Sequence, residues 1–173
     1  MVNIVGSGEV NSTVSGSNTT YTAIPLYGYT FKKWTYNSTD YTNNPITIAS
    51  TVTDITLTFY YTIFNFLKGK VGFDIPDESL YSILLARGID GATDINDLES
   101  EMKDLLYADV LIYGSTMPST YGSIQDSDGG WTHQEGASTI HAADKKRFET
   151  IANDIYKRYG DGNYKASIRI VQL

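Results

Sequence analysis

The chain has 173 residues, of which 41% are hydrophobic, enough to bury one substantial core or two small ones. It contains no cysteine, which excludes disulfides and thiolate-ligated zinc, and its net charge of −7 argues against non-specific nucleic-acid binding through clustered Lys and Arg. An acidic surface favours contacts with basic patches on other proteins.

The first residues, 1–8, lack the basic start and the longer apolar run of a signal peptide. No segment approaches the roughly 20 apolar residues needed to cross a bilayer. We therefore expect a soluble protein that is made in the cytoplasm and has no membrane partner.

Residues 10–62 alternate β-branched and aromatic residues between turn signals, which is typical of short, half-buried strands. In the run 54–61, Ile55, Leu57 and Phe59 fall on one face. The pattern predicts a small, mostly antiparallel all-β domain over residues 1–62. Trp34 fits its core better than a sugar-stacking platform, although the chain has too many tyrosines for all to be buried.

The segment Tyr27–Trp34, the turn at Asn43–Ile48 and the alternating run Ile55–Tyr60 follow one another in an order that resembles divergent internalin-type B-repeat modules of bacterial surface proteins. The resemblance covers roughly residues 10–61. It implies a β-rich spacer or recognition module that has no enzymatic role.

Three helices are expected in the remainder of the chain. The first begins at Ile75–Glu78 and is capped by Gly88. The second begins after Asp94 and stops at Gly114 and Pro118. The third begins after Ser138 or Thr139 and ends at Gly160. We therefore expect an α+β multidomain chain, with a helical domain of three to four helices over residues 63–173.

A polar loop of residues 115–137 separates the second and third helices, and the chain ends in a strand-like segment, 166–173. Loops of this length are usually functional or ordered by a partner. Aromatic insertion and strand addition both suit contacts with neighbouring subunits. The predicted interface residues are Tyr121, Ile124, Trp131, His133, Ile168, Ile170 and Leu173.

Residues Phe66–Phe73, Leu85–Ile89, Asp126–Gly136 and Ala152–Gly160 resemble a small family of proteins from phages and prophages of gut Bacteroidales, which are similar to short helical head-tail connectors. The resemblance implies a structural virion protein that forms a ring, commonly of twelve copies. The portal and other tail or connector proteins would be its partners, and packaged DNA would pass nearby without specific binding. The β domain would then be an added decoration.

No catalytic residue, cofactor or metal site is expected, because Gly-x-Ser-x-Gly, a phosphate-binding glycine loop and His-Glu-x-x-His are all missing. Asp126, Asp128 and Glu135 lack the spacing of a calcium loop, and His133 and His141 do not specify zinc. The alternative function is an adhesion module whose β domain binds glycan or protein.

Overall fold

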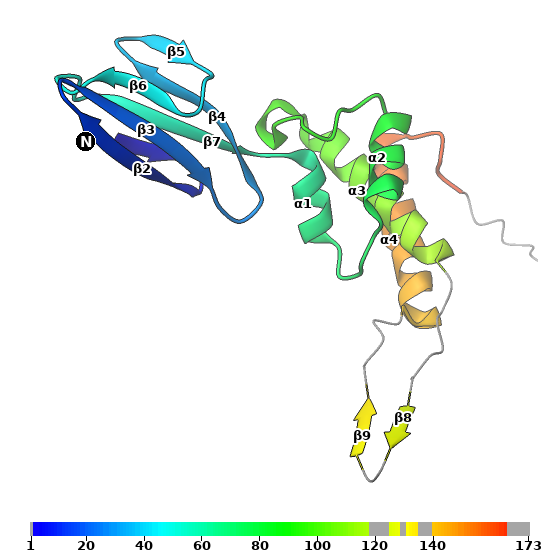
Figure 1. The fold of residues 1–173 in the computed structure, drawn as a ribbon. Coiled ribbons are helices and arrows are strands. Elements are labelled where there is room, and N and C mark those ends of the chain that lie inside the picture. Colours follow the sequence, from blue (N-terminus) through cyan, green and yellow to red (C-terminus); the bar gives the residue numbers. More distant parts are fainter. Residues whose placement is uncertain (1, 118–124, 129–130, 135–139, 166–173) are drawn as a thin grey trace, which may run out of the picture. The chain divides into compact units, whose positions relative to one another are not determined.

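The structure is a computed structural model that describes residues 2–117, 125–128, 131–134 and 140–165 (Figure 1). For 125–128 and 131–134 it describes the backbone alone. The chain divides into two compact units, each described by itself below. The β unit comprises Met1–Phe66 and Gly91–Leu98, and the helical unit comprises Leu67–Asp90 and Glu99–Leu173. The segments 63–66 and 91–98, which the sequence suggested for the helical domain, group with the β unit.

The β unit is a sandwich of two sheets. One sheet has the order β1 (Val2–Val5), β7 (Ile55–Tyr61), β4 (Tyr29–Tyr36) and β5 (Thr39–Tyr41). The other has the order β2 (Gly8–Ser15), β3 (Asn18–Pro25) and β6 (Ile46–Ala49). Pairing is antiparallel except between β1 and β7, so the expectation of a mostly antiparallel domain is confirmed.

The core of the β unit lies between the sheets and draws on β3, β4, β6 and β7. Ile55, Leu57 and Phe59 are buried on alternate positions of β7, as the period-two pattern predicted. Trp34 has no exposed surface and contacts the rings of Tyr21 and Phe31, which confirms its place in the core. Strands β1 and β5 were not indicated by the sequence.

The segment 91–98 is fixed to the β unit by Asp94. Its carboxylate accepts a hydrogen bond from Lys32 at 2.8 Å and another from the backbone N–H of Asn96, at the start of the 3-10 helix η1 (Ile95–Asp97). The backbone N–H of Ile63 also donates to the Thr93 carbonyl. The sequence predicted a long helix from this point, but a 3-10 turn precedes it.

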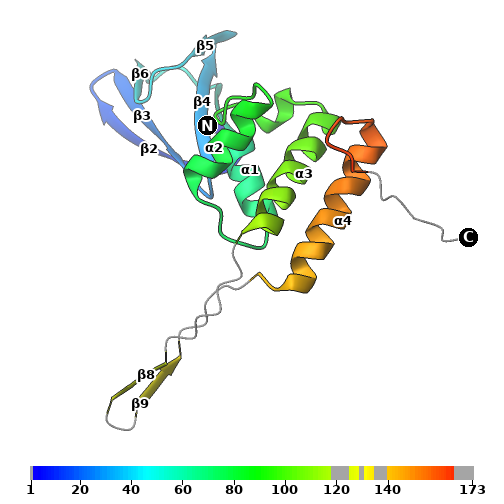
Figure 2. The same ribbon diagram turned by 90° about the vertical axis from the view of Figure 1, so that its right-hand side faces the viewer.

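The helical unit is built on α2 (Asp77–Ala86), α3 (Ser100–Thr116) and α4 (Ala142–Tyr159) (Figure 2). A further helix, α1 (Ile63–Lys70), begins in the β unit and ends in this one. Helix α4 ends at Gly160 in the left-handed conformation, and Gly88 after α2 also has a positive φ, as the sequence predicted. No helix within the described ranges is long and apolar enough to span a membrane.

Helices α3 and α4 pack as an antiparallel pair, with Leu105, Ala108 and Leu111 facing Ala152, Ile155 and Tyr156. Phe73 packs against Phe148 at one edge of this core, with ring centroids 5.3 Å apart. The long inter-helix loop contains two short antiparallel strands, β8 (Gln125–Asp128) and β9 (Trp131–Gln134), which the sequence analysis did not predict.

Candidate functional site

The predicted interface residues fall largely beyond the described part of the chain. Tyr121, Ile124, Ile168, Ile170 and Leu173 lie outside the described residues. Trp131 and His133 lie on β9, where the structure describes only the backbone. In the β8–β9 hairpin, Asp128 pairs with Trp131 next to the turn, and Asp126 pairs with His133. The hairpin therefore places acidic and aromatic positions side by side on the backbone.

The two ends of the insertion that carries this hairpin are joined at its base. The ammonium of Lys145, in the first turn of α4, donates to the carbonyl of Met117 directly after α3. The backbone N–H of His141 donates to the Asp144 carboxylate at 3.3 Å, which satisfies one of the donors at the start of α4. The insertion thus leaves and re-enters the helix pair at one point.

At the other end of α4, Arg87 connects the end of α2 with α3 and with the turn after α4. Its guanidinium donates to the Asp109 carboxylate at 2.6 and 2.9 Å and to Asp161 at 2.6 Å. The Arg87 side chain is only 15% exposed. A bidentate, largely buried pair of this kind fixes geometry as well as charge. We call Arg87, Asp109, Asp161 and Tyr156 the Arg87 cluster.

Hydrogen bonding and burial set the protonation of this cluster. The hydrogen bond from Arg87 lowers the pKa of Asp161 by more than burial raises it, and the backbone N–H of Asn163 adds to the lowering. Burial, together with the hydrogen bond to Asp109 at 2.7 Å, raises the pKa of Tyr156. At neutral pH, Asp161 is therefore ionised, and Tyr156 keeps its proton and donates a hydrogen bond to Asp109.

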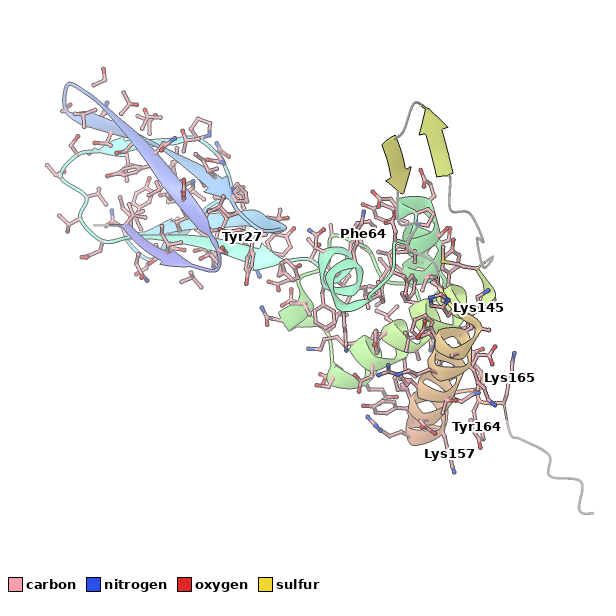
Figure 3. The ribbon with its side chains drawn as sticks, turned by 90° about the horizontal axis from the view of Figure 1, so that it is seen from below. Tyr27, Phe64, Lys145, Lys157, Tyr164 and Lys165 are labelled. Carbon is pink, nitrogen blue, oxygen red and sulfur yellow. The ribbon has the colours of Figure 1, made fainter. Side chains whose placement is uncertain are left out.

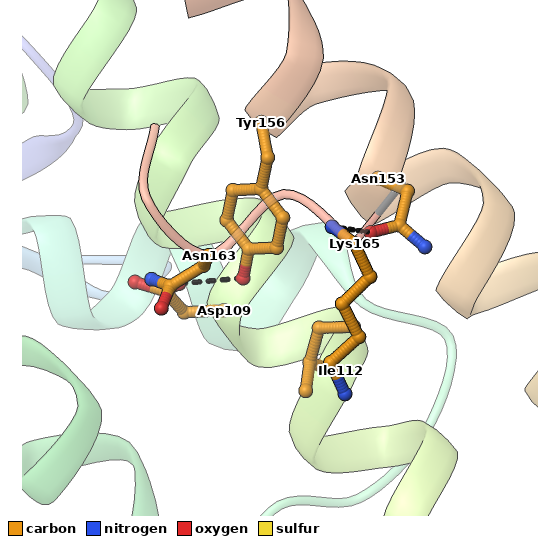
Figure 4. A pocket seen from close by; sticks show the side chains of 6 residues that line it. All are labelled: Asp109, Ile112, Asn153, Tyr156, Asn163 and Lys165. Atoms are coloured by element: carbon orange, nitrogen blue, oxygen red, sulfur yellow. Dashed lines mark hydrogen bonds between the residues drawn. The ribbon is translucent and has the colours of Figure 1, made fainter. Parts of the chain in front are cut away.

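A pocket of about 320 Å³ opens beside the cluster (Figure 4). It is lined by Asp109, Ile112, Asn153, Tyr156, Asn163 and Lys165. Ile112 and the Tyr156 ring supply apolar surface. The Asn153 side chain accepts a hydrogen bond from the backbone N–H of Lys165 at 3.3 Å, which holds the last described turn of chain against α4. A second hollow, of about 270 Å³, shares Asp109 and Asn163 with the first.

Positive charge and an exposed aromatic ring gather around this pocket. In Figure 3, Lys157 and Tyr164 lie at the end of α4 away from Lys145, and Lys165 lies beside the helix, nearer to Lys145. Tyr164 is 39% exposed, and Lys157 and Lys165 are both exposed. Lys165 has no ion-pair partner among the residues that the structure describes. The acid of the pocket lining, Asp109, already has partners, because it binds Arg87 and accepts a hydrogen bond from Tyr156. This surface can accept a side chain that is apolar and has an acid beside it.

The β unit presents a separate aromatic surface. The rings of Tyr36 and Tyr41 stack with centroids 4.4 Å apart, and Asp40 beside them binds Lys33 and Thr35. Tyr27 is 84% exposed at a turn with a positive φ. Tyr36 and Tyr41 are half-buried against the core, so Tyr27 is the ring of these three that can stack on a sugar or anchor a protein partner.

Within the ranges described, no three His, Cys, Asp or Glu side chains are grouped so as to hold a metal ion. Of the residues weighed as ligands, Glu135 lies outside those ranges, and the side chains of Asp126, Asp128 and His133 are not described. His141 is exposed at the start of α4.

Sequence reasoning did not find the Arg87 cluster. The available signal was Arg87 itself, which continues the apolar spacing of Leu80 and Leu84 along α2, because a charge on a buried stripe needs a buried partner. Neither Asp109 nor Asp161 could be chosen as that partner from spacing, since 22 and 74 residues separate them from Arg87.

Comparison with known proteins gives one result. Residues 2–63 match the family model of the divergent InlB B-repeat domain. No curated protein and no solved structure matches the chain. The match covers nearly the whole continuous part of the β unit and supports the interpretation of that unit as a B-repeat-like module.

Proposed function

We propose that the chain is a structural virion protein of a tailed bacteriophage, in which the helical unit is a head-tail connector or adaptor subunit that forms a ring between portal and tail. The β unit is an added module that decorates the ring or binds another component. The protein resides in the virion after synthesis in the bacterial host. It uses no cofactor and carries no catalytic group.

The observation that supports this proposal most is that the two ends of the α3–α4 pair present different surfaces. A rigid antiparallel pair carries a long acidic insertion at one end and the Arg87 cluster with its pocket at the other. A subunit with unlike surfaces at its two ends makes heterologous contacts, which close into rings when the rotation between copies allows it. The joined base at Met117 and Lys145 lets the insertion vary without disturbing the helices.

The test is the mass of the full chain, alone and mixed with the cognate portal protein, by light scattering after size exclusion. A matched variant replaces residues 118–139 with a short Gly-Ser linker. We expect a ring-sized assembly, or co-migration with portal, that the variant loses while its melting temperature is kept. A full chain that stays monomeric and does not bind portal contradicts the proposal.

The second candidate is a binding or adhesion module that recognises glycan or protein through its β unit. The family match over residues 2–63 and the exposed Tyr27 favour it. Glycan-array binding by the full chain that Tyr27→Ala abolishes would support this function. Tyr81→Ala, at an exposed tyrosine of α2, serves as the control.

A further inference from the structure

We infer that the pocket beside the Arg87 cluster receives the β8–β9 hairpin of a second copy of this chain, with Trp131 as apolar anchor and Asp128 facing Lys165. The inference rests on the proposed ring and names the contact that would close it. The pocket is the receiving surface and the hairpin is its occupant.

The size of the pocket suits one large side chain. Its volume of about 320 Å³ is at the lower limit of what small-molecule sites occupy. Ile112 and the Tyr156 ring offer an apolar wall, and Asn153 and Asn163 offer amides that can donate and accept. An aromatic residue that enters such a pocket is the usual anchor of a protein interface, and Trp is the residue type most enriched there.

Charge complementarity favours the hairpin as the segment that occupies the pocket. Residues 118–139 contain Asp126, Asp128 and Glu135 and no Lys or Arg. Lys165 lines the pocket, whereas the acid of the lining, Asp109, is paired with Arg87. The register of the hairpin places Asp128 across from Trp131, so an acid accompanies the aromatic anchor at the turn end. Unlike charges on the two surfaces would steer the contact.

Position favours a neighbouring copy over the same copy. The insertion enters the helix pair beside His141, while the pocket is lined by Asn153, Tyr156 and the chain that follows α4. Helix α4 has 18 residues and is therefore about 27 Å long. A hairpin at one end and its receptor toward the other end form the unlike surfaces of a head-to-tail contact.

The test uses full-length variants that each remove one side of the contact. Lys165→Glu alters the pocket and Trp131→Ala removes the anchor. The control is Lys146→Glu, which makes the same charge change at an exposed position of α4 outside the pocket. We expect Lys165→Glu and Trp131→Ala each to weaken self-association by about tenfold or more in sedimentation, and the control to leave it unchanged.

Mixing the two defective variants distinguishes contact between copies from contact within one copy. A Lys165→Glu copy retains its hairpin, and a Trp131→Ala copy retains its pocket, so one intact contact can form between them. The mixture should give a dimer that neither variant gives alone. If Trp131→Ala lowers the melting temperature, the single variant Asp128→Lys is used in its place. The double variant that combines Asp128→Lys with Lys165→Glu exchanges the two charges and should regain assembly.

Fluorescence gives a second readout, because the chain has two tryptophans and Trp34 is fully buried. A collisional quencher therefore reports mainly on Trp131, whose quenching should fall as the protein assembles. Assembly that Lys165→Glu leaves intact, or a mixture that gives no dimer, overturns the pocket contact while the proposed ring stands. A parent chain that is monomeric both alone and with portal overturns both.

Discussion

Arg87 joins two carboxylates that reach it from different parts of the helical unit. Arg87→Gln leaves Asp109 and Asp161 partly buried without their partner, and we expect it to lower the free energy of unfolding of the helical unit by about 3–5 kcal/mol. Far-UV circular dichroism during urea unfolding measures this. The control, Arg158→Gln, removes a cation that is 62% exposed and lies 3.7 Å from Asp104, and should cost about 0–1 kcal/mol. Equal losses in the two variants would contradict the role given to Arg87.

Asp161 links the stability of the helical unit to pH. Its pKa is lowered in the folded state, so its contribution is present above the unfolded pKa of about 3.9 and disappears as pH falls through the folded value. Asp161→Asn should therefore be less stable than the parent at about pH 7, and the difference should shrink below about pH 4. Melting curves over this range test the prediction, with exposed Asp154→Asn as control. A difference that does not depend on pH would rule it out.

Gly114 provides space for Phe73 against α3. A Cβ at Gly114 would lie 2.5 Å from Cζ of Phe73, whereas a Cβ at Gly72 meets nothing within 4 Å. Gly114→Ala should destabilise the helical unit by about 1–3 kcal/mol despite the better helix propensity of alanine. Gly72→Ala should be close to neutral. A stabilised Gly114→Ala protein would show that the ring of Phe73 moves aside at little cost.

Among the elements, segment 91–98 is held in the β unit by backbone hydrogen bonds and by the Asp94 carboxylate. Asp94 binds Lys32 through one oxygen and caps η1 through the other. Asp94→Asn keeps a capping oxygen and loses the ion pair, while Asp94→Ala loses both. The backbone N–H groups of Ile63 and Phe64 donate to Thr93 and Gly91. We expect their hydrogen-exchange rates to be lowest in the parent, higher in Asp94→Asn and highest in Asp94→Ala. Hydrogen exchange by mass spectrometry measures them. Identical exchange in all three proteins would mean that the segment is held by other contacts.

The sequence predicted elements whose signal is local. Buried and more exposed residues alternate along strand β7, and Trp34 lies in the core. Helices α2 and α4 are each followed by a glycine with a positive φ. Strand β1 was missed because Val2–Val5 is short and its pairing with β7 is parallel and distant in sequence. The hairpin β8–β9 was missed because Gln125–Asp128 is polar and has no apolar alternation. The Arg87 cluster needs contacts across 74 residues, which no local pattern encodes.

On the scale of the whole molecule, the chain combines two units of different kinds. Residues 2–63 match the divergent InlB B-repeat domain, and the helical unit supplies the surfaces on which the proposed assembly rests. Residues 1–62 carry a net −1 and residues 63–173 a net −6, but Asp94 and Asp97 belong to the β unit, so the two units carry a net −3 and −4. Both units are therefore acidic, which suits contacts with basic patches on partner proteins.

The most direct test of the ring is native mass spectrometry of the full chain, alone and with portal. We expect a closed oligomer of defined copy number, or a defined complex on portal, and we expect Lys146→Glu to assemble as the parent does. A monomer at every concentration that also fails to bind portal would rule out the ring and favour a binding module that acts through its β unit.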